Sequence, residues 1–101
     1  MSPYGREIME ACCEVYGITP KQFTSHRRYQ HWAECRWMCW MILYQNGHAT
    51  YMGLGEEFGG WDHGTVLHGV RRLEQLIPIN KGGRKKFEQV EHLLNREEVK
   101  A

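Results

Sequence analysis

The sequence lacks any long hydrophobic run. Its longest apolar stretch, residues 37–44, is far shorter than the roughly 20 residues that a membrane-spanning helix needs. Residues 1–7 also lack the hydrophobic region of a signal peptide. We therefore expect a cytoplasmic protein without a membrane partner.

Motifs for nucleotide binding and catalysis are missing as well. No segment reads G-x-x-x-x-G-K-[ST], the phosphate-binding loop, and the run Lys81-Gly82-Gly83-Arg84 does not fit it. No nucleophile stands in a recognisable pattern with a base, and Glu56 and Glu57 look like solvated helix surface. We expect no enzymatic activity, no nucleotide partner and no cofactor.

The cysteines do not form the pattern of a disulfide framework or of a zinc ribbon. Four are present, at Cys12, Cys13, Cys35 and Cys39. Adjacent cysteines pair poorly, and Cys35 and Cys39 lie four apart in an apolar helical pattern rather than at zinc-finger spacing. We interpret them as reduced, buried thiols without a metal; the alternative is zinc held by Cys35 and Cys39 together with Cys12 or His26.

Positive charge is scarce overall, with a formal net charge of +1, which excludes a strongly basic nucleic-acid binder. Residues 1–77 hold seven basic and eight acidic side chains, whereas residues 78–101 hold six and four. The basic segment 26–31 contains Arg27 and Arg28 and no acid. A second basic cluster, open to interpretation as solvated surface or phosphate contact, comprises Lys81, Arg84, Lys85 and Lys86.

What is present predicts one all-α domain over residues 1–101. The chain is 42% hydrophobic with four tryptophans, which suffices for a core of its own. Helical spacing and caps predict five to six helices. We expect them over residues 3–16, a short turn from residue 20, and 31–45, 50–58, 62–77 and 84–96, with a break at 81–83. Tyr4 and Met52 are expected to face inward.

Two of these segments, 50–58 and 62–77, are joined by a short turn containing glycines, as in a helix-turn-helix. The N-terminal residues of the second helix would reach base edges in the major groove. Candidate side chains on its outer face are Asp62, His63, Thr65, His68 and Arg71. His68 is equally interpreted as a partly buried structural residue, and Arg71 as solvated surface.

The basic segment supplies the second half of this candidate site. Arg27 and Arg28 lie on a predicted loop, from which arginine can enter a narrow minor groove. Arg36 follows two turns into the next helix and could reach a phosphate. Trp61, just before the second helix of the pair, could pack on the DNA backbone or on a partner protein.

The run from Phe58 to His68, FGGWDHGTVLH, resembles a family signature. The C-terminal domain of the bacterial replication initiator DnaA carries F-G-G-R-D-H-[ST]-T-V-x-H. The similarity extends in register over about residues 13–76 and includes Arg27 and Arg28. It implies a Trp-repressor-like helix-turn-helix that binds a short asymmetric element, the DnaA box.

Carried over by position, the resemblance implies major-groove contacts for Asp62, His63 and Thr65. It implies a minor-groove role for Arg28 and a phosphate contact for Arg36. It also places His48 at the start of the helix-turn-helix, where contacts to the DNA backbone are made.

The sequence departs from the family pattern at positions that contact DNA. Gln30 replaces a basic residue in the loop, Trp61 replaces the signature arginine, and Gly64 replaces a serine or threonine that would contact bases. Each change removes positive charge or a base contact, which lowers affinity or discrimination.

Two hypotheses follow. The first is sequence-specific binding of double-stranded DNA in the control of replication initiation or transcription, without ATPase activity. The second is a protein-interaction module of the same fold that modulates a replication or transcription partner. The net charge and the lost contacts favour the second, whereas Arg28, Asp62, His63 and Thr65 favour the first.

Overall fold

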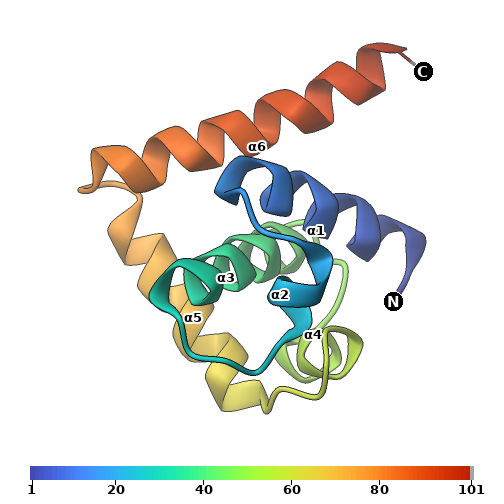
Figure 1. Ribbon diagram of the computed structural model, residues 1–101, viewed down its shortest axis with the longest axis vertical. Helices are drawn as coiled ribbons and strands as arrows, with labels where there is room; N and C mark the ends of the chain where they lie inside the picture. The colour runs from blue at the N-terminus through green and yellow to red at the C-terminus, as the bar shows by residue number, and fades with distance from the viewer. Residues whose placement is uncertain (101) are drawn as a thin grey trace.

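The computed structural model describes the backbone of residues 1–100 and the side chains of residues 1–95. Within that part the chain forms helices only, which confirms the predicted all-α fold. The elements are α1 (Pro3–Tyr16), α2 (Pro20–Thr24), α3 (Gln30–Gln45), α4 (Tyr51–Glu57), α5 (His63–Leu76) and α6 (Lys81–Lys100). Figure 1 shows α3 in the middle of the molecule, with α1 and α5 on opposite sides of it and α6 lying across α1.

Local capping explains where the first helices begin and end. The Ser2 hydroxyl accepts a hydrogen bond from the Gly5 amide at 3.0 Å, with Pro3 at the first helical position. Gly17 ends α1 with φ 67°, a left-handed conformation that glycine adopts at little cost. Thr19 and Gln22 then cap α2 reciprocally. The helix over residues 3–16 and the short turn from residue 20 thus form where the sequence predicts them.

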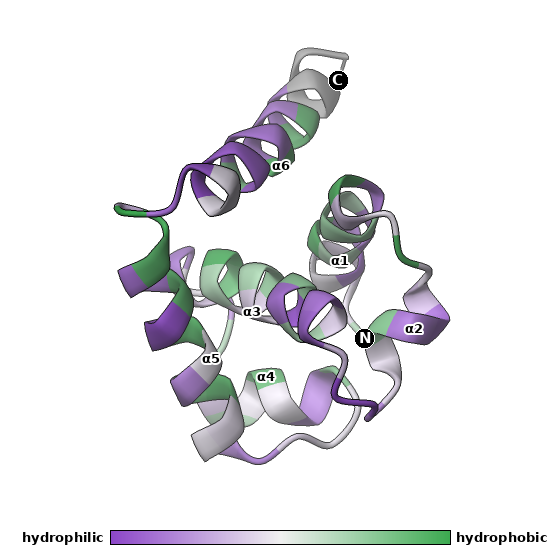
Figure 2. Cartoon of the chain, turned by 60° about the vertical axis from the view of Figure 1, so that its left-hand side comes forward, coloured by the Kyte–Doolittle hydropathy of each residue, from purple (hydrophilic) through white to green (hydrophobic). Residues whose placement is uncertain are grey.

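The central helix α3 is buried on most of its circumference and carries the largest core side chain, Trp40. Trp40 is 1% exposed, and Met38 and Leu43 are fully buried. α5 approaches α3 closely because Gly69 faces the Trp37 indole, where a Cβ atom would collide with the ring. Figure 2 shows the complementary pattern, with hydrophilic residues along the outer sides of α5 and α6.

The C-terminal helix starts earlier than predicted. Residues 81–83 were expected to form a break, yet they form the first turn of α6. The reason is a cap: the Asn80 side-chain oxygen accepts a hydrogen bond from the Gly83 amide at 2.8 Å. Gly83 is buried, and a Cβ atom added there would lie 3.7 Å from the Leu76 side chain, an ordinary contact distance. The cap outweighs the low helix propensity of two glycines.

Two expected core residues lie at the surface instead. Tyr4 is 40% exposed, and its hydroxyl accepts a hydrogen bond from the Asn46 side chain at 2.8 Å. Met52 is 59% exposed in the first turn of α4. In this short helix, Leu54 and Phe58 are fully buried and Tyr51 packs partly against the core. The inward face therefore runs through residues 51, 54 and 58 and leaves Met52 outside it.

Candidate nucleic-acid interface

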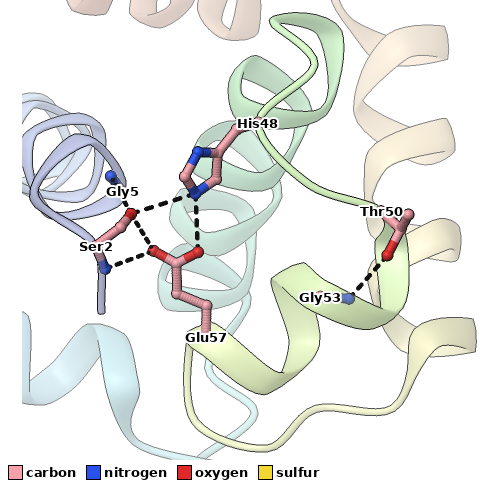
Figure 3. Close-up of polar contacts among 6 residues, drawn as sticks. All are labelled: Ser2, Gly5, His48, Thr50, Gly53 and Glu57. Carbon is pink, nitrogen blue, oxygen red and sulfur yellow. Dashed lines mark hydrogen bonds and ion pairs between the residues drawn. The ribbon is translucent and has the colours of Figure 1, made fainter.

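The helix-turn-helix consists of α4, the turn at residues 58–62, and α5. Thr50 caps α4 through the Gly53 amide at 3.1 Å (Figure 3). In the turn, Gly59 and Gly60 have φ values of 114° and 79°, which side chains with a Cβ rarely adopt. The Gly60 amide donates to the Gly55 carbonyl at 2.9 Å. The turn geometry therefore depends on its glycine pair.

α4 and α5 pack closely because Gly55 faces the Trp61 carbonyl. A Cβ atom at residue 55 would collide with that oxygen. The close packing therefore requires glycine at residue 55, despite its low helix propensity. The inner face of α5 is anchored by Val66, Val70 and Leu73, all fully buried, and its outer face remains free.

The start of α5 presents a capped but exposed end. Asp62 Oδ1 accepts a hydrogen bond from the Thr65 amide at 2.7 Å. This bond, together with one from the Thr65 hydroxyl, holds the pKa of the Asp62 carboxyl below its ordinary value. Asp62 is thus a carboxylate at neutral pH with one oxygen engaged in the cap. His63, Gly64 and Thr65 are exposed beside it.

The basic loop at residues 25–29 is held in place by Arg36. Its guanidinium donates hydrogen bonds of 3.1 Å to the carbonyls of Phe23, Ser25 and Arg27. Arg36 is only 3% exposed, and burial lowers its pKa. The guanidinium thus fixes the loop backbone from within. The phosphate contact expected for Arg36 stays a prediction. Arg27 and Arg28 remain exposed on that loop.

Trp61 connects this loop to the helix-turn-helix. Its ring stacks on His26 with centroids 4.1 Å apart and planes 2° from parallel. The Arg36 guanidinium carbon lies 4.7 Å from the ring centroid. His26 Nε2 also lies 2.7 Å from the Gly59 carbonyl oxygen. The tryptophan that replaces the signature arginine is thus half-buried and packs within the protein.

Loop and helix-turn-helix together border one open hollow of about 710 Å³. The predicted site residues that line it come from the loop, the start of α3 and the start of α5: Arg28, Gln30, Arg36, Trp61, Asp62, Gly64, Thr65 and His68. Arg71 lines a neighbouring groove along α5 together with Gly64 and His68. Arg27 and His63 are exposed but line neither surface.

His48 does not line this hollow; it lies in a polar network with Ser2 and Glu57, the last residue of α4 (Figure 3). Its Nε2 is 2.9 Å from Glu57 Oε1 and 3.3 Å from the Ser2 hydroxyl. Ser2 also donates its amide and hydroxyl to Glu57 Oε2, at 3.0 and 2.7 Å. The network thus ties Ser2 to the end of α4. The contact expected between His48 and the DNA backbone stays a prediction.

Glu57 was expected to be solvated, yet its side chain is only 14% exposed. Burial opposes its ionisation. The hydrogen bonds from Ser2 and His48 outweigh burial and hold the pKa of the Glu57 carboxyl below its ordinary value. The carboxylate is therefore the centre of this network.

The four cysteines are free and buried between α1 and α3. Burial raises the pKa of Cys12 and of Cys39, so both are thiols at neutral pH. Among the side chains of residues 1–95, no three histidine, cysteine or carboxylate groups are placed to hold a metal ion.

The hollow and the groove are also lined by residues outside the set of predicted contacts. His26, Trp37, Trp40 and Gly60 also line the hollow, and Arg72 and Gln75 line the groove along α5. For His26 the available signal was its place beside Arg27. For Trp37 and Trp40 the apolar pattern indicated core, and Trp40 is indeed buried.

No helix in the described part of the chain has the length and apolarity required to cross a bilayer.

The family model "Bacterial dnaA protein helix-turn-helix" matches residues 6–73. This range runs from within α1 to within α5.

Curated relatives match the same region. The chromosomal replication initiator protein DnaA of Caulobacter vibrioides (strain NA1000 / CB15N) is 37% identical over 70 residues, 69% of this chain and 14% of the relative. That of Ruegeria sp. (strain TM1040) is 34% identical over 74 residues, 73% of this chain and 16% of the relative. That of Streptococcus pyogenes serotype M5 is 27% identical over 86 residues, which are 85% of this chain and 19% of the relative. The chain thus spans less than a fifth of the length of these relatives.

The family model covers more than half of the chain, and the turn that carries the FGGWDH run has the geometry that its glycines require. The chain belongs to the bacterial DnaA helix-turn-helix family.

Proposed function

We propose that this protein binds double-stranded DNA sequence-specifically, in the control of replication initiation or transcription. The observation that carries the proposal is the shared hollow between the basic loop and the start of α5. A duplex seated there meets Arg28 from one side and the exposed end of α5 from the other. These two elements are suited to adjacent minor and major grooves.

Base contacts are assigned to the exposed end of α5. His63 and Thr65 offer hydrogen-bonding groups on the first turn, and the free oxygen of Asp62 can accept from a cytosine amino group. Gly64 between them offers no side chain. We infer a narrower set of base contacts than the family signature provides, with discrimination concentrated at His63, Thr65 and Arg28.

Arg36 and Trp61 support this arrangement from within. By holding the carbonyls of the loop, Arg36 presents Arg28 on a fixed backbone. By stacking on His26, Trp61 joins that loop to the turn before α5. The two DNA-contacting elements are therefore one connected surface, which lowers the conformational entropy lost on binding.

A specific observation also favours the second candidate, a protein-interaction module. Two positions that carry DNA-contacting arginines in the family, Arg36 and Trp61, are used internally here. With a net charge of +1, the electrostatic attraction to DNA is weaker than in a basic domain. A partner protein in replication or transcription would then occupy the same hollow.

The deciding experiment is selection from randomised duplexes, followed by sequencing and gel shifts. We expect a defined motif to be enriched, and we expect Arg28→Ala and His63→Ala each to abolish enrichment while leaving the fold intact by circular dichroism. Arg6→Ala is the matched control, because Arg6 is an exposed arginine of α1. Absence of enrichment at low salt would reject sequence-specific recognition, and absence of any duplex binding would favour the interaction module.

A further inference from the structure

Positive charge on α5 continues beyond the end assigned to base reading. A single groove runs along the outer face of α5. Its lining residues recur at helical spacing and are Gly64, Leu67, His68, Arg71, Arg72 and Gln75. At about 1.5 Å per residue, Arg72 lies roughly 10 Å along the helix axis from Thr65. The groove therefore leads from the exposed start of α5 toward its C-terminal end.

Three more cations follow where α5 passes into α6. Lys81, Arg84 and Lys85 are exposed in the first turns of α6. Lys86, the fourth member of the cluster in the sequence, turns inward instead. Its ammonium lies 3.8 Å from Glu34 and 4.7 Å from the centroid of the Tyr16 ring. We name the α5–α6 corner after the two helices that carry its four exposed cations, Arg72, Lys81, Arg84 and Lys85.

These four cations are not neutralised within the protein. Across residues 1–95 the ion pairs are His48–Glu57 and Lys86–Glu34, and neither involves the corner. Glu74 on α5 accepts a hydrogen bond from Gln45 of α3 at 3.1 Å. Glu88 is the nearest exposed acid along α6. The corner therefore retains its positive charge at neutral pH.

The acidic residues of α1 lie on another side of the molecule. Glu7, Glu10 and Glu14 are exposed on α1, which lies across α3 from α5 (Figure 1). The small net charge of the chain thus conceals an uneven distribution, with acids on α1 and cations along α5 and at the corner. Such polarisation orients a polyanion toward one side.

We propose that the α5–α6 corner is a second phosphate-binding surface for duplex DNA, engaging the backbone beside the segment that α5 reads. This rests on the proposed function, because the duplex must first be seated on the helix-turn-helix. The corner contacts the sugar–phosphate backbone and adds affinity without sequence information. It compensates in part for the positive charge missing at Gln30 and Trp61.

An anionic membrane surface would meet the same cations, and Ile79 is 83% exposed beside them. Continuity favours DNA: the groove on α5 leads from Gly64, at the reading end, to Arg72 at the corner. A bilayer surface is broad and flat, so binding to it does not require cations arranged along a groove. Duplex DNA, with one charge for about every 1.7 Å of its axis, matches an extended row of cations.

The test is the salt dependence of binding to a mixed-sequence duplex of about 30 base pairs, because each lost phosphate contact lowers the log–log slope by about 0.9. We expect Arg84→Gln to lower the slope by about 0.9 and Arg84→Gln/Lys85→Gln by nearly 2, with a loss of roughly tenfold or more at low salt. Arg6→Gln, the same change on α1, leaves the slope unchanged. Thermal unfolding verifies that all variants fold.

A slope for the double variant equal to that of Arg6→Gln overturns the proposal. So does a double variant that keeps the wild-type slope but loses binding to vesicles with about a quarter anionic lipid, because the corner is then a lipid contact. Selection distinguishes this result from failure of the proposed function. The double variant should still enrich the wild-type motif. A wild-type protein that binds duplex but selects no motif contradicts the proposed sequence recognition and leaves the corner proposal standing. If the wild-type protein binds no duplex even at low salt, both proposals fail.

Discussion

Trp61 and His26 stack with their ring planes 2° from parallel, and this contact joins the turn before α5 to the basic loop. The family signature has an arginine where this chain has Trp61. An arginine at this turn would be free to contact DNA under the proposed function, whereas the tryptophan packs within the protein, on His26 and near Arg36. This chain therefore lacks a cation at the turn, and the tryptophan instead fixes the geometry between the two elements that we propose contact DNA.

Restoring arginine at residue 61 should reverse that trade. Losing the aromatic stack and the cation–π contact should lower the free energy of unfolding by about 1–2 kcal/mol. A regained phosphate contact should steepen the salt dependence of duplex binding by about 0.9. Urea unfolding and salt-dependent gel shifts of Trp61→Arg measure the two effects separately.

Trp61→Phe is the control for this exchange, because it keeps an aromatic ring on His26 and adds no charge. It should retain most of the stability and the wild-type salt slope. If Trp61→Arg is as stable as the wild type, the stack does not hold the loop to the turn.

Arg36 gives a second prediction, on structure rather than DNA contact. Lysine retains the charge but cannot donate to three carbonyls in the fork geometry of a guanidinium. Arg36→Lys should therefore lower the free energy of unfolding by roughly 2–3 kcal/mol, the range for lost hydrogen bonds to a charged group. Arg27→Lys, an exposed change on the same loop, should stay within about 0.5 kcal/mol. Equal stability of the two variants in urea would contradict the buried role of Arg36.

Arg36 also marks a limit of sequence reading. Helical spacing fixes where the residue lies on α3, but not that the loop folds back so that three carbonyls meet it. His48 and Glu57 are similar, because their network includes Ser2, distant in sequence. Nothing in the local pattern of Glu56 and Glu57 distinguishes the solvated acid from the half-buried one. Long-range hydrogen bonds of this kind carry no local signal.

The helix-turn-helix, by contrast, could be predicted because its signals are local. Thr50 and Asp62 cap the two helices through amides three residues ahead, and Gly59 and Gly60 supply the left-handed turn. The α6 boundary was missed for a local reason as well. The Asn80 cap competes there with two glycines, and propensity alone favours a break.

Glu57 gives a prediction on pH. Because its folded-state pKa is lowered, its contribution to stability is present above the unfolded value, about 4.3. The contribution is lost as the pH falls through the folded value. Glu57→Gln should therefore be less stable than the wild type at neutral pH, by roughly 1 kcal/mol. The difference should vanish in strongly acidic buffer. Urea unfolding across that range measures it, with Glu56→Gln as the exposed control; a constant difference at all pH values contradicts the network.

Gly64 offers the sharpest test of how this chain departs from its family. It is exposed on the first turn of α5, and an added Cβ meets only Asp62 Oδ1, at an ordinary contact distance of 3.7 Å. Gly64→Thr therefore fits without strain, and replacing glycine inside a helix should add a few tenths of a kcal/mol of stability. If the hollow seats DNA as proposed, the new hydroxyl and methyl reach base edges. Discrimination among duplexes should rise by about 1–3 kcal/mol at one position of the selected motif.

Gly82→Thr is the control, since Gly82 is also an exposed glycine in the first turn of a helix. An added Cβ at residue 82 lies 3.3 Å from Asn80 Oδ1, a tight contact, so thermal unfolding first verifies that this variant folds. It lies at the α5–α6 corner, where the contacts proposed are to the DNA backbone, so it should leave the selected motif unchanged. Parallel selections with wild type, Gly64→Thr and Gly82→Thr compare the information content of the motif position by position. A Gly64→Thr variant that folds and binds duplex yet enriches the same motif would mean that the start of α5 does not face the bases.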